Sequence, residues 1–161
     1  MARIVIACAG PLIVFASVDL LFVLEGLFSE LTITESVRAE CNAKPGSDVQ
    51  RIDAAVEAGW LCVQRDLAPP EVLSPGLGAG ETNSICLALR APEETLLILD
   101  DRLARRYALR RGLNFVGTVR LLDAAERRGL VRDAADCIAR MAEHGYRISP
   151  DLLEHVRTRT P

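Results

Sequence analysis

The sequence contains 161 residues, of which 50% are hydrophobic, and its formal net charge is −3. That amount of apolar material is enough for one hydrophobic core, so we expect a single domain over residues 1–161. The net negative charge, with a pI near 5.5, provides no overall basic field for nucleic acid. Any contact with RNA would therefore need a local basic patch.

The five cysteines form no recognisable metal-binding or disulfide motif. They include no CxxC pair and no zinc-like spacing. We therefore expect buried, reduced thiols in a cytoplasmic protein, at Cys8, Cys41, Cys62, Cys86 and Cys137. The apolar stretch 4–18 follows a single arginine and is interrupted by Pro11, with Asp19 directly after it. A strand and a helix are expected there, not a targeting segment or a membrane span.

The first half of the chain predicts strands alternating with helices. The strands are short apolar or β-branched runs, expected at residues 3–7, 31–33 and 60–64. The helices have apolar residues at helical spacing and are expected at residues 12–24, 35–42 and 48–58. Pro11 suits a first helical turn, Thr34 can cap the second helix, and Gly59 ends the third. A surface loop rich in proline and glycine follows at 66–80.

The second half continues the alternation. Strands are expected at residues 95–99 and 114–116, and helices at residues 81–90, 102–111, 118–128 and 133–144. Ser149, Pro150 and Asp151 stand in the favoured order for opening a last short helix. Such alternation favours parallel strands joined by right-handed crossovers, so we expect an α/β fold of three layers, α/β/α, with a central, mostly parallel sheet. Ligands of such sheets bind at the carboxyl ends of the strands.

Acidic residues follow the predicted strands or lie on the next helix. Asp100 and Asp101 come directly after the strand 95–99, while Glu40 and Glu81 lie on predicted helices. Several carboxylates at one crevice suit Mg²⁺ or Mn²⁺, which prefer oxygen ligands. A single carboxylate such as Asp100 is also a common helix cap, so both interpretations stay open.

Several segments together resemble the PIN-domain family, in the branch similar to VapC-type toxins. They are, in order, residues 4–13 (IVIACAGPLI), 35–40 (ESVRAE), 76–81 (GLGAGE), 96–101 (LLILDD), 117–118 (GT) and 145–149 (GYRIS). The resemblance implies a metal-dependent endoribonuclease, often a toxin held inactive by an antitoxin protein, and a homodimer. It implies that Glu40, Glu81 and Asp100 are catalytic metal ligands, with Asp101 beside them.

The first of these segments departs from the family pattern. Cys8 stands where the family usually has an aspartate, Ala9 and Gly10 replace small hydroxyl residues, and Asn83 replaces a second acid sometimes seen after Glu81. A thiol with an unperturbed pKa of about 8.5 is a poor ligand for Mg²⁺, so we expect weakened metal binding. Cys8 would instead pack as a small apolar residue or favour a softer ion.

Arginines supply a candidate nucleic-acid-binding surface. Arg102, Arg105 and Arg106 fall within two turns of the helix after Asp100 and would hold phosphates beside a metal, or else form a solvated helix face. The glycine-rich segment 75–80 follows no strand, which argues against a dinucleotide loop.

Three functions stay open from the sequence. The first is a metal-dependent ribonuclease weakened by Cys8, and the second is an inactive relative that binds RNA or a protein partner. A thiol-based sensor at Cys8 is the third. None of them involves a membrane.

Overall fold

The computed structural model describes residues 2, 4–67, 73–148, 154 and 158. The strands within these residues are β1 (Ile4–Ala7), β2 (Leu31–Thr34), β3 (Leu61–Gln64), β4 (Thr95–Ile98) and β5 (Asn114–Val116). The helices are α1 (Ala9–Ser17), α2 (Leu21–Phe28), α3 (Glu35–Cys41), α4 (Ser47–Ala58), α5 (Ala79–Ala88), α6 (Arg102–Arg110), α7 (Thr118–Arg127) and α8 (Ala134–Glu143). The helix predicted to open at Ser149 lies outside the described residues.

The strands form one sheet in the order β3-β2-β1-β4-β5, and every neighbouring pair in it is parallel. The predicted α/β fold with a mostly parallel sheet is therefore confirmed. β1 is central, because its register pairs Ile4 with Thr95 on one side and Ile6 with Thr32 on the other. The strand order reverses beside β1, and the carboxyl ends of β1 and β4 meet there, which is where ligands of open parallel sheets bind.

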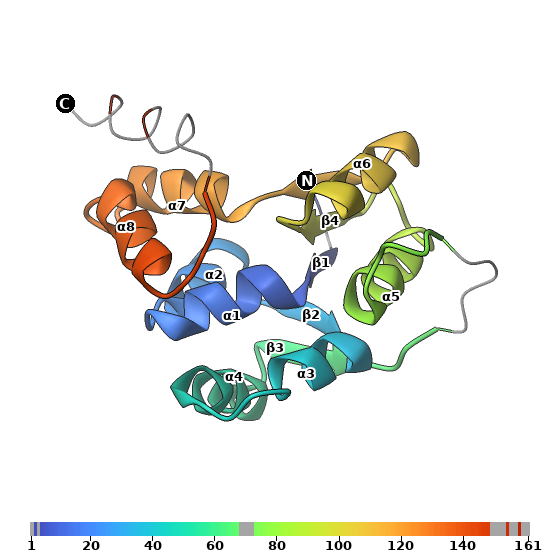
Figure 1. Cartoon of the computed structure of the whole chain (residues 1–161), viewed down its shortest axis with the longest axis horizontal. Helices are drawn as coiled ribbons and strands as arrows, with labels where there is room; N and C mark the ends of the chain where they lie inside the picture. Colours follow the sequence, from blue (N-terminus) through green and yellow to red (C-terminus); the bar gives the residue numbers. More distant parts are fainter. Residues whose placement is uncertain (1, 3, 68–72, 149–153, 155–157, 159–161) are drawn as a thin grey trace.

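Alternating side chains of the central strands build two cores. Val5 and Ala7 of β1 belong to the larger core, under α1, α2, α4, α7 and α8. Ile6 and the following Cys8 belong to the smaller core, under α5 and α6. Because successive side chains of a strand point to opposite faces, β1 is buried on both faces, and its sequence is apolar throughout. Figure 1 shows α5 and α6 on one side of the strands and α1, α2, α7 and α8 on the other.

The prediction of one helix over residues 12–24 is wrong. The segment forms α1 and α2, whose axes differ by 120°. The chain turns at Asp19, whose φ of 58° lies in the left-handed region, which aspartate tolerates better than most residues. Arg51 of α4 holds this turn, since its guanidinium donates to the carbonyl of Ala16 at 2.7 Å and lies 3.4 Å from the Asp19 carboxylate.

No single helix among the described residues is long and apolar enough to cross a membrane; α1 and α2 meet that test only as a bent pair. All five cysteines are free, but the expectation that all are buried is wrong for Cys62, which is partly exposed.

Candidate functional site

Glu40 lies at the end of α3, and its carboxylate contacts the beginning of α5. Its Oε1 accepts a hydrogen bond from the backbone N–H of Gly80 at 2.8 Å. Gly80 is the second residue of α5, where backbone N–H groups have no partner within the helix and the helix dipole is positive. A Cβ at Gly80 would lie only 2.7 Å from Glu40 Oε2. The close approach of the Glu40 carboxylate therefore accounts for glycine at position 80.

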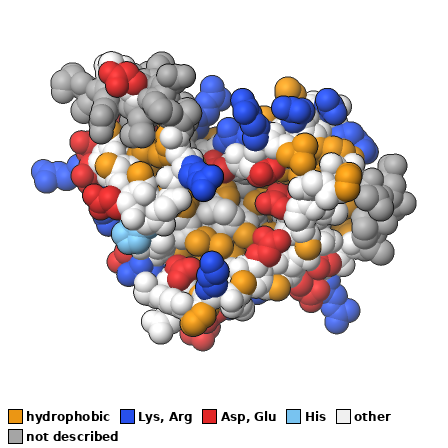
Figure 2. Space-filling view, viewed as in Figure 1, with side chains coloured by type: hydrophobic (Ala, Val, Ile, Leu, Met, Phe, Trp, Pro, Cys, Tyr) orange, Lys and Arg blue, Asp and Glu red, His pale blue; other side chains and the backbone are white. Residues whose placement is uncertain are grey.

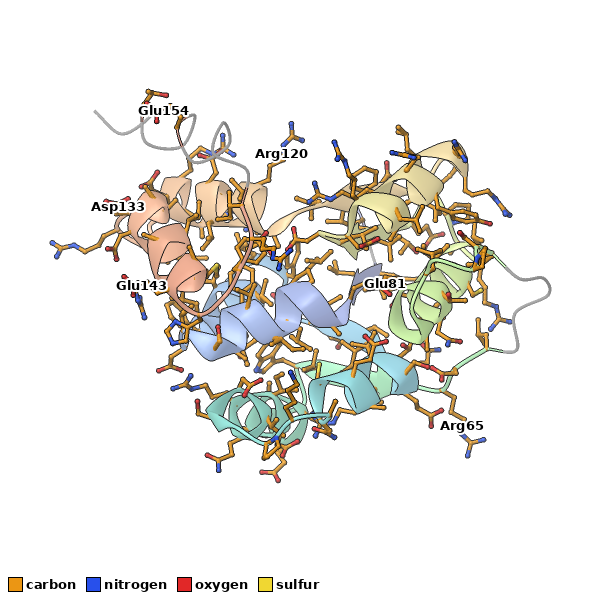
Figure 3. All side chains as sticks on the ribbon, viewed as in Figure 1. Arg65, Glu81, Arg120, Asp133, Glu143 and Glu154 are labelled. Atoms are coloured by element: carbon orange, nitrogen blue, oxygen red, sulfur yellow. The ribbon has the colours of Figure 1, made fainter. Side chains whose placement is uncertain are left out.

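Glu81 shares this corner with Glu40. A Cβ at Gly78 would lie 2.6 Å from Glu81 Oε2 and 3.7 Å from Glu40 Oε1, so both carboxylates reach the same small region. Figure 3 shows Glu81 on the side of α5 that faces the centre of the molecule. Burial raises the pKa of Glu81 above its usual value, and the charges of Glu40 and Asp101 raise it further. Two crowded anions of this kind favour a nearby cation or proton.

Asp100 follows β4, and its carboxylate is held by three groups. Oδ1 accepts from the backbone N–H of Thr118 at 2.9 Å and from the guanidinium of Arg105 at 3.1 Å. Oδ2 accepts from the Thr118 hydroxyl at 2.5 Å. Thr118 is the first residue of α7, so Asp100 caps that helix from a distance. The helix-cap interpretation therefore describes part of what Asp100 does.

Arg105 is fixed beside Asp100. Its Nε donates to the carbonyl of Leu99 at 2.7 Å, and its guanidinium lies 5.9 Å from the centre of the Phe115 ring. Gly117 leaves room for it, because a Cβ there would overlap the guanidinium and lie 3.0 Å from Asp100 Oδ1. Arg105 therefore supplies the positive charge next to Asp100.

Asp101 has a different role from its neighbour. It is the N-cap of α6, and its side chain accepts from the backbone N–H of Ala104 at 2.7 Å. Its charge still reaches Glu81, whose pKa it helps to raise. We call Glu40, Glu81 and Asp100 the acidic cluster. Asp101 is at its margin, because its own carboxylate caps α6.

Cys8 lies at the centre of the candidate site and is 1% exposed. Burial raises the pKa of the thiol to about 12, and the charges of Glu81, Glu40 and Asp100 add to this effect. The thiol is therefore neutral and packs in the smaller core. A reactive cysteine needs an exposed, electropositive setting, so this environment argues against a thiol-based sensor.

Ser84 of α5 lies beside Cys8. Its hydroxyl is near enough to the thiol to lower the pKa of the thiol, against the larger effect of burial. The same hydroxyl is fully buried and makes no hydrogen bond of ordinary geometry within the described part of the chain. Asn83, where the family sometimes has an acid, turns away and donates to Ser36 Oγ and the Ala79 carbonyl, each at 3.0 Å.

The charges of all three predicted carboxylates act on the Cys8 thiol, but this proximity does not amount to a metal-binding arrangement. Within the described residues, no three His, Cys, Asp or Glu side chains are arranged to hold a metal ion. Glu40 and Glu81 are adjacent, whereas Asp100 is engaged by Arg105 and Thr118. In this arrangement the side chains do not fit a divalent metal held by three ligands, and the catalytic and metal roles of these residues stay predictions.

The arginines of α6 divide into two groups. Arg105 belongs to the site through Asp100, while Arg102 and Arg106 are exposed. Figure 2 shows basic side chains gathered over α6, with acidic ones nearer the centre of the same face. This basic surface of α6, beside the acidic cluster, is suited to binding the phosphate backbone of a strand that passes the site.

A cavity of about 350 Å³ adjoins the acidic cluster at Asp100. We call it the Tyr146 pocket, and its walls include Asp100, Arg105, Phe115, Arg120, Tyr146 and Arg147. Sequence reasoning missed Thr118, Arg120, Tyr146 and Arg147 as site residues. The available signal was their position, since Thr118 and Tyr146 lie within the segments 117–118 and 145–149 that resemble the PIN-domain family.

Two comparisons with known proteins bear on identity. A search of curated proteins finds no match. A family model described as PIN domain matches residues 4–160, which is nearly the whole chain and agrees with the five-stranded parallel sheet and its helices. PIN domains have a nuclease fold that acts on nucleic acid and generally use divalent metal ions. The chain belongs to the PIN-domain family.

Proposed function

We propose that this protein binds single-stranded RNA at the carboxyl edge of its sheet, and that its metal-dependent cleavage of RNA is lost or strongly weakened. The observation that supports the second part is the buried, neutral thiol of Cys8 among three carboxylates. A neutral thiol there removes one negative charge from the donor set, and sulfur is a poorer ligand than a carboxylate oxygen for Mg²⁺.

RNA binding is supported by the basic surface beside the acidic cluster. Arg102 and Arg106 are exposed on α6, directly after Asp100 and Asp101. They can contact phosphates without giving up an internal ion pair, because none is formed by either within the described residues. The net charge of −3 makes such a local surface necessary for binding.

The test measures the binding of a labelled single-stranded RNA to the wild type and to Arg102→Gln/Arg106→Gln. We expect the double variant to bind at least tenfold more weakly, with a smaller dependence on salt concentration. The matched control is Arg90→Gln/Arg132→Gln, which removes two exposed arginines that precede β4 or follow α7. Equal binding by all three proteins, or no binding by the wild type, would overturn the proposal.

A residual ribonuclease is the second candidate, favoured by the adjacent carboxylates of Glu40 and Glu81. It predicts RNA cleavage that requires Mn²⁺ or Mg²⁺ and is lost in Glu81→Gln, while RNA binding persists. Cleavage that is absent in the wild type but gained in Cys8→Asp supports the proposed impairment. An antitoxin partner and a homodimer are further proposals from the VapC-like resemblance, and light scattering of the purified chain tests the dimer.

A further inference from the structure

The Tyr146 pocket has the size and polarity of a small-ligand site. Its volume of about 350 Å³ lies within the range of ligand pockets, which combine apolar walls with a few polar groups. Here the apolar walls include Phe115, and the polar groups are three arginines, the Tyr146 phenol and Asp100. The pocket adjoins the acidic cluster through Asp100 but contains neither Glu40 nor Glu81.

The charge of the pocket is positive. The Arg105 guanidinium lies 3.1 Å from the Asp100 carboxylate, so these two charges offset each other. Arg120 and Arg147 therefore determine the sign of the pocket's charge. Both are exposed, and neither forms an ion pair with a carboxylate in the described part of the chain. Figure 3 shows Arg120 at the start of α7, on the side toward α6. Two exposed arginines lining a pocket, with no ion pair to a described carboxylate, are suited to a phosphate group.

The interior offers flat surfaces that are held in place. Burial raises the pKa of the Tyr146 phenol above its usual value, and the Asp100 charge raises it further, so the ring is neutral and lies against Asp100 and Thr118. The planar guanidinium of Arg105 is fixed by Leu99, Asp100 and Phe115. Unstacked bases of single-stranded RNA bind to aromatic rings and guanidinium planes of this kind.

We infer that the Tyr146 pocket binds one nucleoside monophosphate unit of RNA, with the base against Tyr146 and Arg105 and the phosphate at Arg120 and Arg147. This inference rests on the proposed RNA binding and assigns it a specific subsite. An RNA strand that follows the basic surface of α6 past Asp100 would place one nucleotide in the pocket and the adjoining phosphodiester near the acidic cluster.

The experiment compares the binding of a labelled hexameric RNA with that of unlabelled AMP and UMP, titrated separately by calorimetry. Arg120→Gln/Arg147→Gln is expected to weaken RNA binding at least tenfold and to reduce the slope of log affinity against log salt by about 1.4, at about 0.7 for each lost contact with single strands. Tyr146→Leu is expected to weaken binding about tenfold with an unchanged salt slope. Tyr146→Phe keeps the ring and is expected to bind RNA more tightly than Tyr146→Leu.

The outcomes separate this inference from the proposed function. RNA binding that is lost in Arg102→Gln/Arg106→Gln but unchanged in both pocket variants overturns the pocket and leaves the proposed function standing. Mononucleotide binding that the pocket variants abolish, without any RNA binding, supports the pocket as a site for free nucleotides and overturns the proposed function. Arg132→Gln is the matched control, because Arg132 is exposed and does not line the pocket. Each variant's thermal unfolding shows whether it is folded.

Discussion

The carboxylate of Asp100 accepts two hydrogen bonds from one residue, Thr118, through its backbone N–H and its hydroxyl. Thr118 is 0% exposed and opens α7, whereas Asp100 ends the segment after β4. The pair therefore joins the end of β4 to the beginning of α7, the helix that follows β5. It also sets the direction in which Asp100 faces Arg105 and the Tyr146 pocket.

Thr118→Val should destabilise the protein by about 1.5–3 kcal/mol, because the hydrogen bond from its buried hydroxyl to the partly buried carboxylate of Asp100 is lost without a change in size. Urea denaturation at pH 7 measures the change in free energy of unfolding. Thr118→Ser is the control, since it keeps the hydroxyl and loses only a methyl group. A serine variant less stable than the valine variant would contradict the role given to this hydroxyl.

Gly80→Ala and Gly10→Ala form a matched pair, because each glycine is the second residue of its helix. A Cβ at Gly10 meets no atom within 4 Å, whereas one at Gly80 would press on the Glu40 carboxylate. Alanine gains about 0.5–1 kcal/mol in a helix, but the lost bond from Gly80 to a charged group costs about 1.5–3 kcal/mol. We expect Gly10→Ala to be neutral or stabilising and Gly80→Ala to lose about 1 kcal/mol, measured by urea denaturation. Equal effects would show that Glu40 does not support α5.

Glu81→Gln should stabilise the folded protein at pH 8. The folded pKa of Glu81 is raised above its usual 4.5, so between those two values the folded state binds more protons than the unfolded state. Stability therefore falls as pH rises through that interval and stays reduced above the folded pKa. Glu81→Gln has no titrating group at this position, so its free energy of unfolding should change less between pH 4 and pH 8 than that of the wild type.

Thermal unfolding across that pH range checks the effect of Glu81. Glu57→Gln is the control, because Glu57 is exposed on α4. If the Tm of Glu81→Gln and that of Glu57→Gln depend on pH in the same way, Glu81 is not the source of the pH dependence.

Cys8→Asp should become sensitive to metal. Without a divalent ion, the introduced carboxylate is buried among Glu40, Glu81 and Asp100, and the resulting repulsion should lower the Tm by about 5–10 °C. Mn²⁺ should recover part of that loss by binding only the folded state. The wild type and Cys8→Ser, which lack the carboxylate, should show no comparable shift. Equal Mn²⁺ shifts in all three proteins would contradict the role assigned to Cys8.

Sequence patterns predicted the layers of this fold because its strands are short apolar runs that alternate with helical segments. The two helices α1 and α2 were predicted as one, since the apolar run continues through the turn and only Asp19 marks it. The start of α5 was predicted two residues late, at Glu81 instead of Ala79. Its first turn is stabilised by Glu40, which is far away in the sequence, so local helix propensity could not predict the position of that turn.

The position of the candidate site was predictable in part. Strand ends and family resemblance pointed to Cys8, Glu40, Glu81 and Asp100, and the charges of the three carboxylates all act on the Cys8 thiol, while their catalytic and metal roles stay predictions. The hydrogen bonds that occupy Asp100 were not predictable, because they come from Arg105 and Thr118 on separate helices. The Tyr146 pocket was missed for a similar reason: its aromatic and basic walls become neighbours only when the residues after α8 fold back on β5.

The central place of β1 has a consequence for biosynthesis. β1 is translated before β4, although its register pairs Ile4 with Thr95. Until β4 leaves the ribosome, one edge of β1 has no strand partner, a state prone to association with other chains. We therefore expect a nascent chain stopped before Thr95 to bind a chaperone more strongly than one stopped after Val116, which contains β1 to β5.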